Sequence, residues 1–198
     1  IAAAQNAILP AVSSALAAAP IKGRITLSGY EGSELLVARL LIESGADIPY
    51  VGTACAKSPW SAAAAAWLEA KGVEVKFRAA LEDDLAAMEA FQPDLAIGTT
   101  PVVQKGKERG IPALYFTNLI SARPLMGPAG AGSLAQVVTA AMGNKDRMSR
   151  MKGFFEGVGR DDTAGVWERE PNLRPDFRAL HQKKLDKQAR AAKAEQMI

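Results

Sequence analysis

The turn at Gly29-Tyr30-Glu31 combines backbone freedom with a phenol and a carboxylate directly after an apolar stretch of the chain. With Gly32 close behind, its glycines leave backbone N–H groups open to a ligand at the start of a helix, as nucleotide-binding folds do. Glu31 has an alternative role that we favour, favourable interaction with the dipole of the following helix. The full G-x-G-x-x-G pattern is missing, so we expect no bound dinucleotide.

Thr53 and Cys55 end the next apolar stretch, which reads IPYVGTAC. A cysteine in this place can contact a ligand, but a lone thiol without a histidine nearby in the sequence is not expected to be a nucleophile. Cys55 is the single cysteine of the chain. It therefore excludes an internal disulfide framework and any cluster site made of this chain's thiolates alone, and we predict no metal site in these residues.

A third group of candidates lies in residues 111–132, where an apolar stretch runs into a segment rich in glycine and proline. We interpret it as a buried strand followed by a loop that approaches a ligand or a neighbouring chain closely. The alternative is a structural turn before the next helix, with the polar residues acting as helix caps. The substrate-binding candidates of this segment are Thr117, Asn118, Leu119, Leu125, Met126 and Gly127. No residue is assigned a catalytic role.

Apolar stretches of strand length alternate with segments of helix length from Arg24 onward. The expected strands are apolar on both faces, which favours a parallel sheet with right-handed crossovers. We predict an α/β fold, a Rossmann-like open parallel sheet with helices on both faces, plus a C-terminal helical extension. The expected strands cover residues 24–29, 48–54, 73–79, 94–100 and 111–118. The expected domains are an entering helix at 1–20, the Rossmann-like domain at 21–142, and a helical extension with a basic tail at 143–198.

Composition excludes several classes of protein. Residues 143–198 hold 13 of the 24 Lys and Arg but only 9 of the 21 Asp and Glu, so the basic character belongs to the tail. The tail lacks interleaved aromatic residues and any recognised nucleic-acid-binding module, and we expect no nucleic-acid partner. No apolar run approaches the about 20 residues of a membrane span, and the first residues lack the features of a signal peptide. We therefore expect a soluble, cytoplasmic protein.

Three long stretches of the sequence resemble the C-terminal Rossmann-like domain of the nitrogenase component 1 superfamily. They are SGYEGSELLVARLLIESGADIPYVGTAC, PDLAIGTTPVVQKGKERGIPALYF and ARPLMGPAGAGSLAQVV. The similarity extends through the tail NLRPDFRALHQKKLDKQARAAKAEQMI, which favours the branch that acts on chlorophyllide a over the dark protochlorophyllide reductases. The similarity rests on these long stretches and their order along the chain rather than on one short motif.

The resemblance implies an ATP-driven, ferredoxin-dependent reduction of the chlorin C7=C8 double bond in bacteriochlorophyll synthesis. It further implies a heterotetramer with a related partner subunit, and a separate reductase component that carries the ATP sites and an iron–sulfur cluster. The [4Fe-4S] cluster of the catalytic component would have its ligands outside these residues. We therefore expect residues 1–198 alone to be inactive.

One position departs from the molybdenum nitrogenases of this superfamily. A histidine that follows the equivalent strand ligates their metal cofactor, whereas this sequence has Thr117. Threonine is a poor ligand for a soft iron–sulfur cofactor, so the position is better suited to an organic substrate such as a tetrapyrrole. Three alternatives stay open: a dark protochlorophyllide reductase subunit, a non-redox α/β ligand-binding domain, and a segment that mainly serves assembly with the partner subunit.

Overall fold

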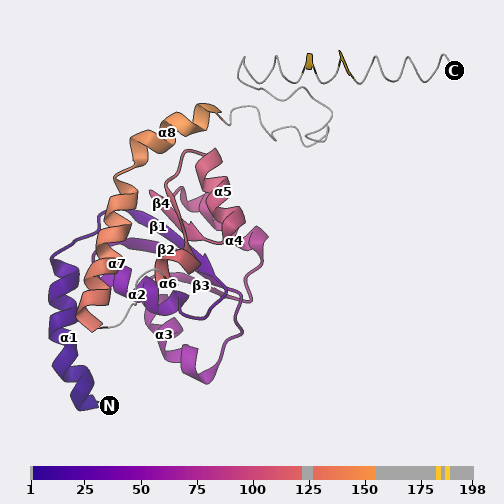
Figure 1. Cartoon of the computed structure of the whole chain (residues 1–198). Coiled ribbons are helices and arrows are strands. Elements are labelled where there is room, and N and C mark those ends of the chain that lie inside the picture. The colour runs from indigo at the N-terminus through magenta and orange to yellow at the C-terminus, as the bar shows by residue number, and fades with distance from the viewer. Residues whose placement is uncertain (1, 122–126, 155–181, 184–185, 188–198) are drawn as a thin grey trace. The chain divides into compact units, whose positions relative to one another are not determined.

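A five-stranded, fully parallel sheet forms the centre of the protein (Figure 1). The computed structural model describes residues 2–121, 127–154, 182–183 and 186–187, and the account below concerns the unit that ends at Phe154. The strand order is β3-β2-β1-β4-β5. The strands are β1 (Arg24–Gly29), β2 (Asp47–Thr53), β3 (Glu74–Phe77), β4 (Leu95–Gly98) and β5 (Ala113–Tyr115).

The central strand β1 is buried on both faces from Ile25 to Gly29, which fits its place in the middle of the sheet. Leu27 pairs in register with Val51 of β2 on one side and with Ile97 of β4 on the other. None of these three side chains is exposed. A strand buried on both faces requires helices above and below, as the sequence predicted.

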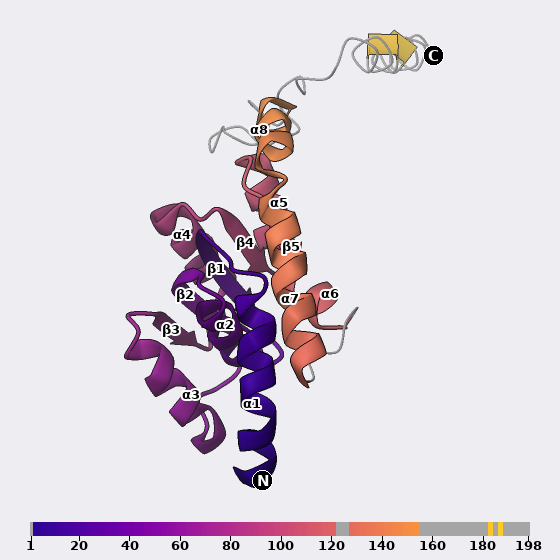
Figure 2. The same ribbon diagram turned by 90° about the vertical axis from the view of Figure 1, so that its left-hand side faces the viewer.

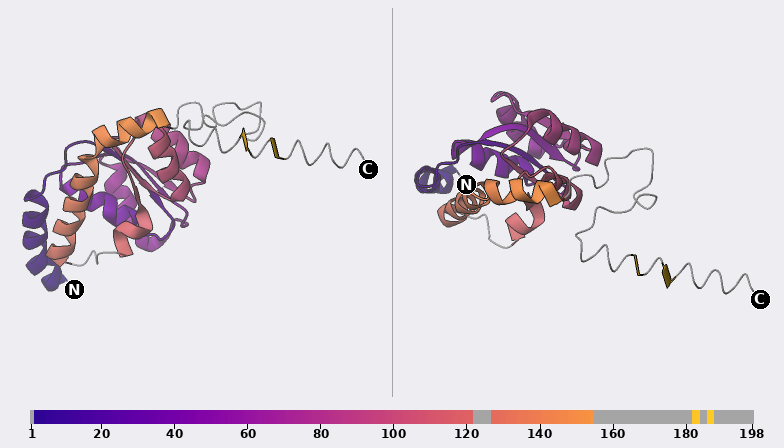
Figure 3. Two further views of the ribbon diagram at one scale, coloured as in Figure 1. Left: turned by 45° about the horizontal axis from the view of Figure 1, so that its top comes forward. Right: turned by 90° about the horizontal axis from the view of Figure 1, so that it is seen from above.

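Helices cover both faces of this sheet (Figure 3). The larger core includes Leu27, Leu41 of α2, Leu68 of α3 and Leu134 of α7. A smaller core on the other face joins Met88 of α4 to β4 and α5. The helices are α1 (Ala2–Ala17), α2 (Glu34–Glu43), α3 (Pro59–Glu69), α4 (Leu81–Phe91), α5 (Thr100–Glu108), α6 (Phe116–Ser121), α7 (Gly127–Met142) and α8 (Lys145–Phe154).

The observed fold confirms the predicted α/β class, with a strand in each predicted stretch, although β3 and β4 each end two residues before the predicted strand does. Left-handed turns lie between helix and strand, with φ of 101° at Gly45, 84° at Gly72 and 75° at Gly110. Glycine tolerates this backbone conformation without the clash that a Cβ atom would cause. The domain boundaries stay a prediction.

The last strand is shorter than the sequence predicted. We expected strand structure through Asn118, whereas β5 ends at Tyr115 and α6 begins at Phe116. Phe116 and Leu119, three residues apart, are both buried in the larger core. A helical turn places such a pair on one side, whereas a strand would point them to opposite faces. Thr117 and Asn118 therefore lie in the first turn of α6.

The glycine-rich stretch that we interpreted as a loop is largely helical. α7 begins at Gly127 and runs through Gly130 and Gly132. Gly130 is buried, and a Cβ atom at Gly132 would lie 3.6 Å from the Cβ of Ala15 in α1. Figures 1 and 2 show α1 and α7 side by side. Within the described residues, the small side chains thus allow close packing of α7 against α1.

Candidate functional site

The carboxyl ends of the five strands form the edge at which ligands bind in open α/β sheets. The strand order reverses between β1 and β4, so the connections after these two strands lead away in opposite directions. Two hollows lie at this edge. They flank the turn that follows β1, because Tyr30 lines one of them and Gly32 lines the other.

A buried carboxylate holds the turn after β1. Glu34 at the start of α2 has no exposed surface, and its Oε1 accepts a hydrogen bond from the backbone N–H of Glu31 at 2.8 Å. Its Oε2 accepts the hydroxyl of Thr53 at 3.1 Å. A Cβ atom at Gly29 would collide with the Glu34 carboxylate and approach the ring of Phe116 to 2.9 Å. Gly29 therefore makes room for the carboxylate.

Glu34 is not among the residues that we predicted from the sequence. Glu31 is among them, but it is exposed, and it bonds Glu34 through its backbone N–H rather than through its carboxylate. The one available clue was Ser33-Glu34 at the start of a helix, where an acidic residue is common. That clue does not reveal that the carboxylate is buried and that it links β1 to β2.

The first hollow, which we call the hydroxyl hollow, measures about 430 Å³. A polar contact in it joins residues that are far apart in sequence, because the Tyr30 hydroxyl and Thr117 Oγ1 of α6 lie 3.1 Å apart. This arrangement offers hydrogen bonds to a polar substituent of a ligand. The lining residues are Tyr30, Gly98, Thr99, Thr100, Pro101, Tyr115, Thr117 and Asn118.

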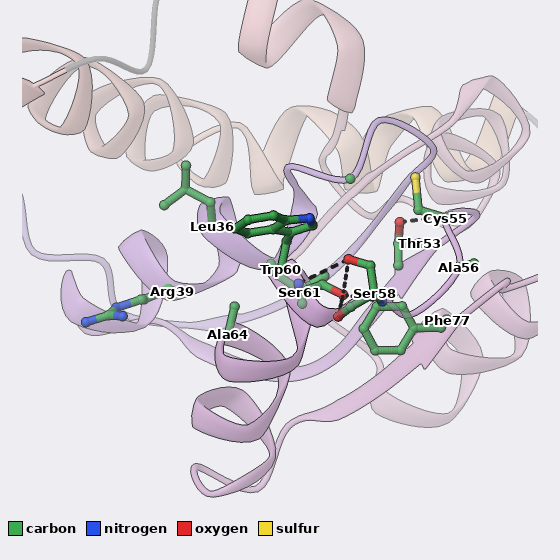
Figure 4. A pocket seen from close by; sticks show the side chains of 12 residues that line it. Leu36, Arg39, Thr53, Cys55, Ala56, Ser58, Trp60, Ser61, Ala64 and Phe77 are labelled. Atoms are coloured by element: carbon green, nitrogen blue, oxygen red, sulfur yellow. Dashed lines mark hydrogen bonds between the residues drawn. The ribbon is translucent and has the colours of Figure 1, made fainter. Parts of the chain in front are cut away.

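The second hollow, which we call the Trp60 groove, measures about 470 Å³ and opens beside α2 and α3 (Figure 4). Cys55 is half-buried at this groove, its N–H donates to Thr53 Oγ1 at 3.2 Å, and its thiol lies 3.7 Å from the Tyr30 carbonyl oxygen. The groove is lined by Gly32, Leu35, Leu36, Arg39, Thr53, Cys55, Ala56, Ser58, Trp60, Ser61, Ala64 and Phe77.

The structure brings some of the predicted site residues together and separates others. Tyr30, Thr117 and Asn118 line the hydroxyl hollow, and Thr53 and Cys55 line the Trp60 groove. Leu119 is buried in the core and lines neither hollow. Gly127 is exposed at the first residue of α7, with φ of 63°. Leu125 and Met126 lie outside the described residues.

A second buried carboxylate lies on the opposite face of the sheet. Asp84 of α4 is 9% exposed, and its Oδ1 accepts the hydroxyl of Tyr50 in β2 at 2.9 Å. Burial raises the pKa of Asp84 to about 6, although the Tyr50 hydrogen bond acts in the other direction. The pKa of Tyr50 is raised as well, first by its own burial and then by the charge of Asp84.

Metal-binding groups do not gather in the part of the chain that the structure describes. No cluster of three or more His, Cys, Asp and Glu side chains there is arranged to hold a metal ion. A [4Fe-4S] cluster takes four thiolates, whereas the sequence contains one cysteine. The residues of this chain therefore do not fit such a cluster by themselves. Among the described helices, none is long and apolar enough to cross a bilayer.

The fold and its carboxyl edge define an open parallel α/β domain with two candidate binding hollows beside the turn after β1. Residues 1–142 match the model of the family described as nitrogenase component 1 type oxidoreductase. The chain belongs to this family.

Two curated relatives are similar over the whole chain. The chlorophyllide reductase 52.5 kDa chain of Cereibacter sphaeroides is 77% identical over 198 residues, which are 100% of this chain and 39% of that protein. The chlorophyllide reductase 52.5 kDa chain of Rhodobacter capsulatus is 72% identical over the same length, 40% of that protein. The chain thus spans about two fifths of the length of these relatives.

The fold also resembles that of a solved nitrogenase, described as Nitrogenase Cp1 at pH 6.5. The TM-score is 0.53 at 20% sequence identity, and the match covers 74% of this chain and 33% of that one. At this level of identity the likeness concerns the fold.

Proposed function

We propose that this chain is part of the catalytic component of a chlorophyllide a reductase and corresponds to a stretch of its Y subunit. The observation that carries the proposal is the 77% identity to a chlorophyllide reductase chain over all 198 residues. Membership in the nitrogenase component 1 family supports the same class of chemistry. The complete protein would reduce the C7=C8 double bond of a chlorin in bacteriochlorophyll synthesis.

The proposed reaction adds two electrons and two protons, so that the C7=C8 double bond becomes a single bond. In our proposal the electrons come from ferredoxin, and ATP is hydrolysed on the separate reductase subunit X. The Z subunit would complete a heterotetramer with the Y subunit, and a [4Fe-4S] cluster would have its ligands outside this chain. None of these electron-transfer steps involves the residues described above.

The contribution of this chain would be to bind and orient the tetrapyrrole. The hydroxyl hollow presents Tyr30 and Thr117 within hydrogen-bond distance of each other, Tyr30 from the turn after β1 and Thr117 from the first turn of α6. Such hydroxyls can bond a carbonyl or carboxylate of the pigment, while the sheet and Glu34 hold their backbones in place. The source of the two protons is left open between the pigment's own carboxyl, a side chain and water.

The test is an anaerobic reconstitution of the full-length parent chain with the Z subunit, the X subunit, ATP and a reductant. The absorption spectrum of added chlorophyllide a is followed, and we expect a bacteriochlorin band to appear. An assembled complex that leaves the chlorin spectrum unchanged would contradict the proposal. Protochlorophyllide would then be the next substrate to test, as expected for a dark protochlorophyllide reductase.

The same assay tests the hydroxyl hollow. Thr117→Val removes a hydroxyl that lies 3.1 Å from that of Tyr30, and we expect kcat/KM to fall about 2- to 10-fold, the worth of one hydrogen bond. Thr139→Val is the matched control, because Thr139 is exposed on α7 and lines neither hollow. Equal values of kcat/KM for the two variants would exclude Thr117 from substrate binding.

A further inference from the structure

The Trp60 groove exposes large apolar side chains that a folded domain usually buries. Trp60 is 93% exposed and Leu36 is 51% exposed. Figure 4 shows the indole of Trp60 beside Leu36, with Ser58, Ser61 and Phe77 continuing the lining. Apolar side chains that are exposed together in a groove, rather than scattered singly, mark a candidate binding site.

The backbone that carries Trp60 is held firmly although its side chain is free. Ser58 caps α3, since its Oγ accepts the N–H of Ser61 at 3.2 Å and its own N–H donates to Ser61 Oγ at 2.9 Å. Pro59 occupies the first turn, where its fixed φ suits the helix start. A ligand that stacks on this indole therefore meets a position that needs no ordering of the backbone.

Arg39 is the charged residue among those that line the groove, and the buried Glu34 carboxylate accepts the hydroxyl of Thr53, which also lines it. No Asp or Glu lines it, and Arg39 at its edge is already paired with Glu43 at 2.9 Å and lies over the Trp67 ring. Lys57 is exposed, and its ammonium lies 5.7 Å from the centre of the Phe77 ring, which lines the groove. Among the residues that the structure describes, no carboxylate lies within ion-pair distance of Lys57. Lys57 is thus an unpaired cation beside the Phe77 ring and is available to an anionic group.

We propose that the Trp60 groove binds the chlorin macrocycle, with the Trp60 indole stacked on the ring system and the Lys57 ammonium paired with the free carboxylate of the pigment. This inference rests on the proposed function. A flat apolar ring that bears one carboxylate matches a groove with an open indole and with an unpaired cation over its Phe77 ring. The groove volume falls within the range of about 300–1,000 Å³ that is typical of pockets for small molecules and cofactors. Trp60 and Lys57 are then positioning residues rather than catalytic ones.

The Trp60 groove and the hydroxyl hollow border the same turn, the one after β1. Gly32 lines the groove, Tyr30 lines the hydroxyl hollow, and Cys55 of the groove lies 3.7 Å from the Tyr30 carbonyl oxygen. A macrocycle seated against Trp60 would therefore border the same turn as the polar groups of the hydroxyl hollow. The two hollows would hold different parts of one pigment.

Pigment binding tests this inference separately from turnover. Chlorophyllide a is titrated into the assembled complex of the full-length parent chain without ATP or reductant, and bound pigment is followed by its absorption shift. We expect Trp60→Ala to raise Kd at least about tenfold, and Trp60→Phe, which keeps an aromatic face, to raise it less. Leu9→Ala is the control, because Leu9 is an exposed apolar residue on α1, 51% exposed, that does not line the groove.

The carboxylate contact has its own readout. Lys57→Ala should weaken binding of chlorophyllide a several-fold but leave binding of its methyl ester unchanged, because the ester carries no charge for Lys57 to pair with. Lys57→Arg should restore binding of the acid. Size-exclusion chromatography of each variant complex shows whether assembly is intact. Loss of assembly in Trp60→Ala would mean that the groove is a protein interface, and would overturn the inference.

The outcomes separate the two proposals. A complex that reduces chlorophyllide a and binds it equally well with and without the Trp60 and Lys57 side chains refutes the groove and leaves the proposed function standing. A complex that binds the pigment through these two residues but never reduces it refutes the proposed function and supports the groove.

Discussion

At the scale of single residues, Gly29 shows how a backbone position serves a buried side chain. The sequence suggested that Gly29 exposes its backbone to a ligand, whereas the structure shows the space above it filled by the Glu34 carboxylate and the Phe116 ring. Glu34 in turn bonds the N–H of Glu31 and the Thr53 hydroxyl. The turn that borders both hollows is thus held by the Glu34 carboxylate, which fits there because Gly29 has no side chain.

This arrangement makes Gly29→Ala a sharp test of the turn. The new methyl group must displace the Glu34 carboxylate or the Phe116 ring, and overpacking of this kind costs about 1–3 kcal/mol of the free energy of unfolding. The measurement is urea unfolding followed by circular dichroism. In the control Gly143→Ala the new atom meets its neighbours at 3.5 and 3.7 Å, ordinary contacts, and the expected change stays within about 0.5 kcal/mol. Indistinguishable unfolding midpoints for the two variants would contradict the crowding at Gly29.

At the scale of elements, α8 is joined to the sheet through one carboxylate. Asp94, just before β4, accepts the Lys145 ammonium of α8 at 2.7 Å and the backbone N–H of Arg24 at 3.0 Å. The Lys145 hydrogen bond, followed by that from Arg24, lowers the pKa of Asp94. The Lys145 pair is largely exposed, so it contributes little, while the contact to Arg24 holds the first residue of β1.

Asp94→Ala and Lys145→Ala separate these two contacts. We expect Lys145→Ala to lower the free energy of unfolding by less than about 1 kcal/mol, since it breaks an exposed ion pair. Asp94→Ala removes the acceptor of Arg24 as well and should cost about 1 kcal/mol more. The expected order in urea unfolding is wild type, Lys145→Ala and Asp94→Ala, in decreasing midpoint. A Lys145→Ala variant as unstable as Asp94→Ala would show that the ion pair carries the whole effect.

The sequence predicted the elements better than the surroundings of the candidate residues. Strand positions followed from apolar stretches such as that of β1, because burial on both faces leaves a pattern that can be read locally. The start of α6 at Phe116 could not be predicted in this way, because it depends on a core contact with Gly29, which is distant in the sequence. Likewise, the glycines of α7 suggested a loop, since their role in packing against α1 is a long-range contact.

The same limit applies to the candidate site. Tyr30, Thr53, Cys55 and Thr117 were predicted because each follows an apolar stretch, and parallel strands bring such ends to one edge. Trp60 and Glu34 were not predicted, because what singles them out is the exposure of the Trp60 side chain and the burial of the Glu34 carboxylate. A tryptophan in an alanine-rich helix predicts a core residue, and only the fold shows that Trp60 is 93% exposed.

At the scale of the whole molecule, the buried carboxylates Glu34 and Asp84 lie in different parts of the fold. Glu34 lies at the edge with the two hollows, whereas Asp84 lies under α4 and takes no part in either hollow. Folding raises the pKa of Asp84 to about 6, above the value of about 3.9 expected in the unfolded chain. Between these two pH values the folded protein keeps a proton that the unfolded chain has lost. The contribution of Asp84 to stability is therefore fully present below about pH 4 and is lost as the pH rises through about 6.

Asp84→Asn should abolish this loss. The amide oxygen can still accept the Tyr50 hydroxyl, but the group no longer ionises, so the variant should match the wild type near pH 4 and exceed it at pH 7 by up to about 3 kcal/mol. The measurement is urea unfolding of both proteins at pH 4.5, 5.5 and 7. Asp83→Asn is the control. The Ala80 N–H donates a hydrogen bond to this exposed carboxyl and lowers its pKa. The Asp83→Asn variant should therefore lose stability above pH 4 rather than gain it. Parallel stability curves for Asp84→Asn and the wild type from pH 4.5 to 7 would show that Asp84 ionises as easily in the folded protein as in the unfolded chain.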